Sequence, residues 1–332
     1  MREAIAQAVV GDEQKREDPT VLELERRAAE LVGQDQAVFL PTATMANQIA
    51  LRVLGEPGDE LLADAHSHLF INELGGPAVH SGLVMRWLPT KAGRFTAEQV
   101  REAVWDRHDT HRPITRLVSI ENTSNSSGGR IWPLEEIAGV AEACRELDLF
   151  LHLDGARLMN ASVATGVPAA QIGRRFDTVT LCLSKGLGCP LGALLAGPAE
   201  RMRKARRLKH LFGGAMRQAG IVAAAGVYAL DHHVVRLADD HARARRLAEG
   251  LLAAGLPVDL EQVETNFVQL DVGPLDLTKQ EAIARLREAG VGLSGTVHST
   301  VLRAVTHLDV SGEDIEAAIE LIPRALGVLA PA

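Results

Sequence analysis

The chain has 332 residues, of which 46% are hydrophobic and 23% charged, and its formal net charge at pH 7 is −8. So much apolar surface excludes a mainly disordered chain, because it can be buried on folding. The acidic balance and an aromatic content of 3% argue against a dedicated nucleic-acid binder.

The cysteines and the N-terminus predict a cytoplasmic location. Cys144, Cys182 and Cys189 are too few and too unevenly spaced for a disulfide framework. The residues after Met1 lack the apolar run of a signal peptide. No uncharged apolar stretch reaches the length of about 18 residues that spans a membrane, so we expect no membrane partner.

Short apolar runs alternate with helical segments before residue 198. In chain order we expect a strand over 37–40, a helix over 45–54, strands over 60–63 and 117–120, a helix over 134–147, and strands over 150–153, 178–183 and 192–196. This alternation predicts βαβ units and an α/β fold with a mainly parallel sheet flanked by helices.

The rest of the chain predicts a small C-terminal α+β domain. Mostly helical sequence over 198–252 is followed by a strand over 267–270, a helix over 279–289, strands near Val291 and Val301, and a final helix from Ser311. We place the boundary inside helical sequence, with a large domain over 1–230 and a small one over 231–332.

A lysine closely follows the expected strand over 178–183. Lys185 stands in the segment LCLSKGLG (181–188), where glycines come after the lysine. At the end of a buried strand, apolar neighbours favour the uncharged, nucleophilic amine that Schiff-base chemistry requires. A surface lysine in a turn is the alternative interpretation.

An aspartate ends the strand over 150–153. Asp154 and Lys185 are both expected at carboxyl ends of strands, the edge that lines the ligand crevice of an open parallel sheet. Pyridoxal phosphate needs such a pair, a lysine for its aldehyde and an aspartate for its pyridine nitrogen. A helix cap or turn is the alternative for Asp154.

A phosphate site is expected where a helix follows the first strand. Small and hydroxylated residues, TATMAN (42–47), open that helix. Its free N–H groups and its dipole suit a phosphate, although Thr42 or Thr44 could be a simple N-cap.

Eight segments, three of which contain the motifs described above, together carry a resemblance to a known family. They are PTATMAN (41–47), SHLF (67–70), ELGGP (73–77), ENT (121–123), DGARLMNA (154–161), LSKGLG (183–188), GGAMRQAG (213–220) and RAVTHLDVS (303–311). In this order they resemble the low-specificity L-threonine aldolases, which are fold-type I pyridoxal-phosphate enzymes. EDPT (17–20) fits the same family.

The resemblance implies a role for each matching residue. Lys185 would form the Schiff base, Asp154 would pair with the pyridine nitrogen, and His68 would stack on the ring. The other expected contacts are Ala43 and Thr44 to the phosphate, Ser184 to the cofactor, Arg157 beside the ring oxygen and substrate carboxylate, Arg217 to a phosphate of a neighbouring subunit, and Arg303 to the substrate carboxylate.

The resemblance also implies the reaction. A β-hydroxy-α-amino acid such as L-threonine or L-allo-threonine would be cleaved to glycine and an aldehyde through Schiff-base and quinonoid chemistry. The family assembles as homodimers or homotetramers with sites at subunit interfaces. Another pyridoxal-phosphate reaction, such as β-elimination or racemisation, and a catalytically impaired family member remain the alternatives.

Three departures bear on those alternatives. Ser124 stands where the family usually has a histidine, and a serine alone is a poor base near neutral pH. Lys15 stands where a tyrosine is common. The family's usual first strand would precede Met1, so we expect weak activity from the chain as it begins here.

Two further groups have ordinary explanations. His66 and His68 lack a third ligand at metal-site spacing, so we expect no metal. The basic run over 201–209 is interrupted by apolar residues at three-residue steps, which is typical of a helix with one solvated face.

Overall fold

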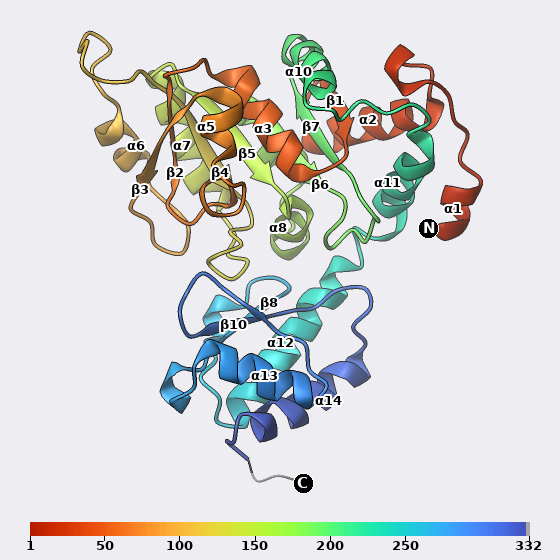
Figure 1. The fold of residues 1–332 in the computed structure, drawn as a ribbon, viewed down its shortest axis with the longest axis vertical. Helices are drawn as coiled ribbons and strands as arrows, with labels where there is room; N and C mark the ends of the chain where they lie inside the picture. The colour runs from red at the N-terminus through yellow and green to blue at the C-terminus, as the bar shows by residue number, and fades with distance from the viewer. Residues whose placement is uncertain (330–332) are drawn as a thin grey trace. The chain divides into compact units, whose positions relative to one another are not determined.

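The computed structural model describes residues 1–329, which form two compact units (Figure 1). The first unit comprises Met1–Thr123 and Trp132–Val234. The second comprises Ser124–Ile131 and the chain from Val235 onward. The units therefore differ from the predicted domains at two places: the segment Ser124–Ile131, which the sequence placed in the large domain, and residues 231–234, which it placed in the small one.

The first unit is built on a seven-stranded sheet in the order β1-β7-β6-β5-β4-β2-β3. Its strands are β1 (Gln36–Leu40), β2 (Glu60–Asp64), β3 (Val84–Leu88), β4 (Thr115–Glu121), β5 (Phe150–Gly155), β6 (Thr178–Cys182) and β7 (Ala193–Gly197). β7 runs antiparallel to both of its neighbours, and the other pairs are parallel. The predicted α/β class with a mainly parallel sheet is confirmed.

Helices flank this sheet. They are α1 (Arg2–Ala6), η1 (Glu13–Lys15), α2 (Pro19–Val32), α3 (Ala43–Leu54), α4 (His68–Ile71), α5 (Gly76–Ser81), α6 (Ala97–Ala103), α7 (Leu134–Glu146), α8 (Leu158–Thr165), α9 (Ala169–Gly173), α10 (Ala199–Leu211) and α11 (Gly220–His232). The sequence pattern missed α2, although Asp18 caps it and Pro19 opens it, as is typical of a helix start.

α3 packs on one face of the sheet, against the apolar strand residues that point to that face. Val38 and Leu40 on β1 and Leu195 on β7 are fully buried against Ile49 and Ala50 of α3. The alternation of strand side chains sends their neighbours, such as Phe39, to the opposite face. α2 packs beside β1 and β7.

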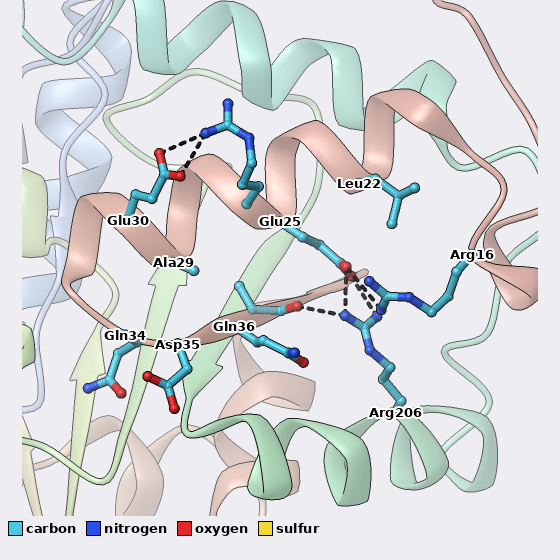
Figure 2. A pocket seen from close by; sticks show the side chains of 11 residues that line it. Arg16, Leu22, Glu25, Ala29, Glu30, Gln34, Asp35, Gln36 and Arg206 are labelled. Carbon is cyan, nitrogen blue, oxygen red and sulfur yellow. Dashed lines mark hydrogen bonds and ion pairs between the residues drawn. The ribbon is translucent and has the colours of Figure 1, made fainter.

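A buried glutamate ties α2 to β1 and α10. Glu25 accepts a hydrogen bond from the Phe39 N–H at 2.9 Å. It also accepts from both terminal nitrogens of Arg206 (Figure 2). Arg16 approaches the same carboxylate at 3.7 Å. Arg16, Glu25 and Arg206 line a surface cavity of about 210 Å³, and none of the residues predicted for the functional site lines it.

The second unit has a three-stranded antiparallel sheet in the order β8-β10-β9. Its elements are α12 (Leu237–Ala253), η2 (Leu260–Gln262), β8 (Phe267–Asp271), η3 (Gly273–Leu275), α13 (Lys279–Glu288), β9 (Ser294–Gly295), β10 (Val301–Val305) and α14 (Gly312–Ala325). The strand expected near Val291 is β9, which lies three residues later because the pairing with β10 begins only at Ser294.

Strand alternation gives this small sheet two different faces. Val268, Leu270 and Leu302 pack into an apolar core with α12, α13 and α14. Gln269 and Arg303, which alternate with them, face the segment Ser124–Ile131: their side chains bond Ser126 and Asn125.

The segment Ser124–Ile131 is attached to the second unit by polar contacts. Gln262 donates to the Gly128 carbonyl at 2.6 Å, and Thr265 donates to the Gly129 carbonyl at 3.0 Å. Both glycines have φ near +78°, and a Cβ on either would collide with these partners. Glycine is therefore required for the close approach.

Among residues 1–329, no single helix is long and apolar enough to cross a membrane, although α11 and α12 taken together meet the length and composition criteria.

Candidate active site

Asp154 and Lys185 lie at the carboxyl ends of neighbouring parallel strands. Asp154 is on β5, in register with Thr180 of β6, and Lys185 follows the last residue of β6 by three positions. Asp154 is 2% exposed, and Lys185 is half-buried. Within the described part of the chain, neither the Asp154 carboxylate nor the Lys185 amine takes part in an ion pair with a side chain of opposite charge, so both groups are available to a ligand.

The first turn of α3 opens beside this edge of the sheet. The Thr42 side chain caps the helix by accepting from the Met45 N–H at 3.1 Å. Ala43 is half-buried and Thr44 is exposed. Their backbone N–H groups have no acceptor inside the helix, which is the arrangement that binds anions.

His68 is held by a buried glutamate. Its Nδ1 lies 2.8 Å from Oε1 of Glu73, whose side chain is fully buried, and its backbone N–H donates to Glu121 at 2.7 Å. The hydrogen bond to Glu73 raises the pKa of His68 above its usual value, outweighing the effect of burial. The imidazole is therefore fixed at Nδ1 and leaves Nε2 for a ligand.

His68, Glu73 and Asp154 place three potential ligand atoms within 4.8 Å of one another. A metal could use such a set, but the atoms already engage protein partners. Asn47 donates to both carboxylates, and His68 contacts Glu73. The expectation of no metal stays a prediction.

The remaining predicted residues of the first unit occupy different settings. Arg157 is half-buried at the start of α8, and Ser184 is exposed between β6 and Lys185. The Arg217 side chain is 60% exposed and pairs with Asp12 at 2.8 Å. Arg157 and Ser184 thus flank the strand ends that carry Asp154 and Lys185.

Arg303 belongs to the second unit. It lies on β10, its guanidinium stands 4.8 Å from the centre of the Phe267 ring, and its Nη1 donates to Asn125. Its Nε is buried without a hydrogen-bond partner, and no described carboxylate forms an ion pair with it. A half-buried cation in this state is suited to an incoming carboxylate.

The departures from the family pattern also have defined positions. Ser124 is 2% exposed, and its backbone pairs with Arg130. Lys15 is exposed in η1. Ser124 therefore offers no group that titrates near neutral pH at the position where the aldolase family usually has a histidine.

Two residues of the site were missed from the sequence. Asn47 and Glu73 are 1% and 5% exposed, and they bond the predicted residues Asp154 and His68. Both lie in the quoted segments TATMAN and ELGGP. The signal that could have identified them from the sequence is the presence of a polar amide and a carboxylate inside these two motifs.

Comparison with known families identifies relatives over most of the chain. The profile described as beta-eliminating lyase matches residues 1–273. The "Probable low-specificity L-threonine aldolase 2" of Arabidopsis thaliana is 40% identical over 98% of this chain and 92% of its own length. The "Low specificity L-threonine aldolase" of Escherichia coli (strain K12) is 40% identical over 95% and 92%.

A solved structure shows the same fold. A putative aromatic amino acid beta-eliminating lyase/threonine aldolase from Exiguobacterium sp. 255-15 superposes with a TM-score of 0.81 at 24% identity, covering 99% of this chain and 93% of its own.

Proposed function

The chain belongs to the beta-eliminating lyase family, and on that premise we propose that it is a pyridoxal-phosphate enzyme that cleaves L-threonine or L-allo-threonine to glycine and acetaldehyde. The observation that carries the proposal is the pair Asp154 and Lys185 at adjacent strand ends. The names of the relatives that are 40% identical support the substrate class.

The residues present fit pyridoxal phosphate. Asp154 is a buried carboxylate that no described arginine or lysine neutralises, so it suits a ring cation. The N–H groups of Ala43 and Thr44 suit the phosphate. We assign Ser184, Arg157 and Arg217 to further cofactor contacts, as the resemblance implies, and we assign the cluster of His68, Glu73 and Asp154 to the cofactor and not to a metal.

When bound, pyridoxal phosphate supplies an aldehyde that reacts with amines and a ring that withdraws electrons from the α-carbon. The chain supplies orientation and proton transfer. Lys185 provides the amine. Arg303 binds the substrate carboxylate with its planar guanidinium, which orients the bond to be broken. Arg157 adds a second cation for that carboxylate.

A base must take the proton of the substrate hydroxyl. Ser124 cannot act as a base near neutral pH without help. We assign the step to His68. The hydrogen bond between its Nδ1 and Glu73 leaves Nε2 free to accept a proton, and the raised pKa makes the neutral ring a stronger base.

We further propose that the enzyme is cytoplasmic and a homodimer or homotetramer. The three cysteines are buried and unpaired, as in a reducing compartment. Leu74, Val79 and Leu211 are 100%, 77% and 75% exposed, and the rings of His80 and Phe212 connect α5 to the end of α10. This exposed apolar surface is typical of a subunit interface.

The decisive experiment is product analysis. The chain is purified with pyridoxal phosphate and supplied with L-threonine and then L-allo-threonine, and glycine and acetaldehyde are quantified. We expect both products from the wild type and neither from Lys185→Ala. An oxoacid with ammonia would indicate β-elimination, and the mirror-image amino acid would indicate racemisation. Either result, or cofactor binding with no product, would overturn the aldolase proposal.

A further inference from the structure

The carboxylate of Asp154 is held by two neutral donors. Oδ2 accepts from Nδ2 of Asn47 at 2.9 Å, and Oδ1 accepts from the Ala156 N–H at 3.1 Å. Neither donor removes the negative charge, and each leaves lone pairs on its oxygen. The orientation of the carboxylate therefore depends on the orientation of Asn47.

Asn47 uses its whole amide in a buried network. Its Nδ2 donates to Asp154 and, at 3.0 Å, to Oε1 of Glu73, while its Oδ1 lies 3.2 Å from Nε2 of His152. The side chain is 1% exposed. A flipped amide would turn its oxygen toward two carboxylates, so the contact with His152 fixes the donor side toward them.

His152 is oriented in turn by β6. It is fully buried on the same face of β5 as Asp154, and its Nδ1 lies 2.9 Å from Oγ1 of Thr178, which is its register partner. A proton on Nε2 lets His152 donate to Asn47 and accept from Thr178. Burial lowers the pKa of His152 to about 4, so the ring is neutral at neutral pH.

We propose that Asn47, locked by His152 and Thr178, is a positioning residue that holds the Asp154 carboxylate in the orientation that binds the pyridine nitrogen of the cofactor. This inference rests on the proposed function. The chain of donors runs from Thr178 through His152 and Asn47 to Asp154, and it carries no charge before its last member. None of these donors neutralises the Asp154 carboxylate.

The test measures binding of pyridoxal phosphate and the protonation of its ring. The apo-protein is titrated with pyridoxal phosphate by absorption and fluorescence to give Kd, and the absorption of the bound cofactor is followed against pH. For Asn47→Leu we expect Kd to rise about tenfold or more and the pH midpoint of the absorption change to fall. A Kd within about twofold of wild type, with an unchanged midpoint, would overturn the proposal.

Two variants keep Asn47 and Asp154 in place, in case Asn47→Leu does not fold. Thr178→Val removes only the outer hydroxyl, and His152→Leu removes the donor to Asn47. We expect a smaller rise in Kd, about threefold, from Thr178→Val and a larger one from His152→Leu. His152→Gln can still donate to Asn47, so it should recover most of the affinity. Equal affinities for the leucine and glutamine variants would contradict the relay.

Thr180→Val is the matched control. Thr180 lies two residues from Thr178 on β6 and is equally buried, but its Oγ1 has no partner among the described residues. This variant should leave Kd and the pH midpoint unchanged, and a shift as large as that of Thr178→Val would count against the proposal. If wild-type protein fails to bind pyridoxal phosphate, the proposed function fails. If wild type binds and Asn47→Leu binds equally well, only this inference fails.

Discussion

Arg303 donates from Nη1 to Oδ1 of Asn125 at 2.5 Å, although 178 residues separate them in the sequence. Asn125 lies on the segment Ser124–Ile131, which Gln269 also bonds through the carbonyl of Ser126. The guanidinium is thus held between Phe267 and Asn125, with its Nε unpartnered. The segment that follows β4 therefore positions the proposed carboxylate-binding residue.

Removal of this contact should affect substrate binding more than turnover. Asn125→Ala leaves the Arg303 side chain free to change rotamer, so we expect KM for L-threonine to rise about tenfold with a smaller change in kcat. Kd for pyridoxal phosphate should not change. Steady-state kinetics and cofactor titration measure these quantities. Gln269→Ala, which removes the hydrogen bond to Ser126 of the same segment and leaves the Arg303–Asn125 hydrogen bond in place, is the control, and an equal rise in KM from it would show that the direct contact is not the cause.

Burial of neutral His152 should make folding sensitive to acid. Its folded pKa of about 4 lies below the ordinary value of 6.5, so the unfolded chain binds the proton more tightly. The stability contribution is complete above about pH 6.5 and falls as the pH drops toward 4, by roughly 3 kcal/mol in total.

Urea unfolding of the wild type and of His152→Gln between about pH 4 and pH 7 measures this term. The carboxylates contribute equally to both proteins, so the difference isolates His152. We expect the stability of the variant to fall less steeply with acid. Parallel pH profiles would show that His152 does not titrate in this way.

Asp18 joins the starts of two helices. Its side chain accepts from the Val21 N–H at 3.0 Å in α2 and from the Gly220 N–H at 2.8 Å in α11, and the residue is fully buried. Asp18→Ala leaves both groups unsatisfied, so we expect a loss of about 3 kcal/mol in the free energy of unfolding. Thr96→Ala removes an exposed cap in the same unit and should cost only about 1 kcal/mol. Similar losses from the two variants in denaturant titrations would refute the dual role.

The exposed apolar surface formed by Leu74, by Val79 of α5 and by Leu211 of α10 should mediate association. Leu74 is fully exposed and adopts a φ of +53°, an unusual conformation for a leucine. We expect Leu74→Asp combined with Leu211→Asp to shift the protein toward monomers in sedimentation experiments at micromolar concentration, because burial of a charge in an apolar interface is unfavourable. Trp87→Ser alters an equally prominent side chain on β3 (65% exposed) and should leave association intact. Unchanged sedimentation of the double variant would place the interface elsewhere.

The sequence alone determined the fold class and the residues of the proposed chemistry. Apolar runs alternating with helical periodicity located six of the seven strands of the large sheet, because that pattern depends on local burial. β3 was missed, since Val84, Arg86 and Trp87 are partly or fully exposed and the strand lies at the sheet edge. Lys185 and Asp154 were found because each closely follows or ends an apolar run, and the quoted motifs linked them to a family.

Only the tertiary structure decided which groups hold those residues. Asn47 contacts Asp154 across 107 residues, and His152 reaches Asn47 across 105. Such contacts arise when α3 packs on the sheet, and no local pattern encodes them. The attachment of Ser124–Ile131 to the second unit likewise depends on hydrogen bonds from Gln262 and Thr265. Local periodicity specifies which surfaces are buried, whereas the partners of a buried polar group are fixed only when distant segments pack together.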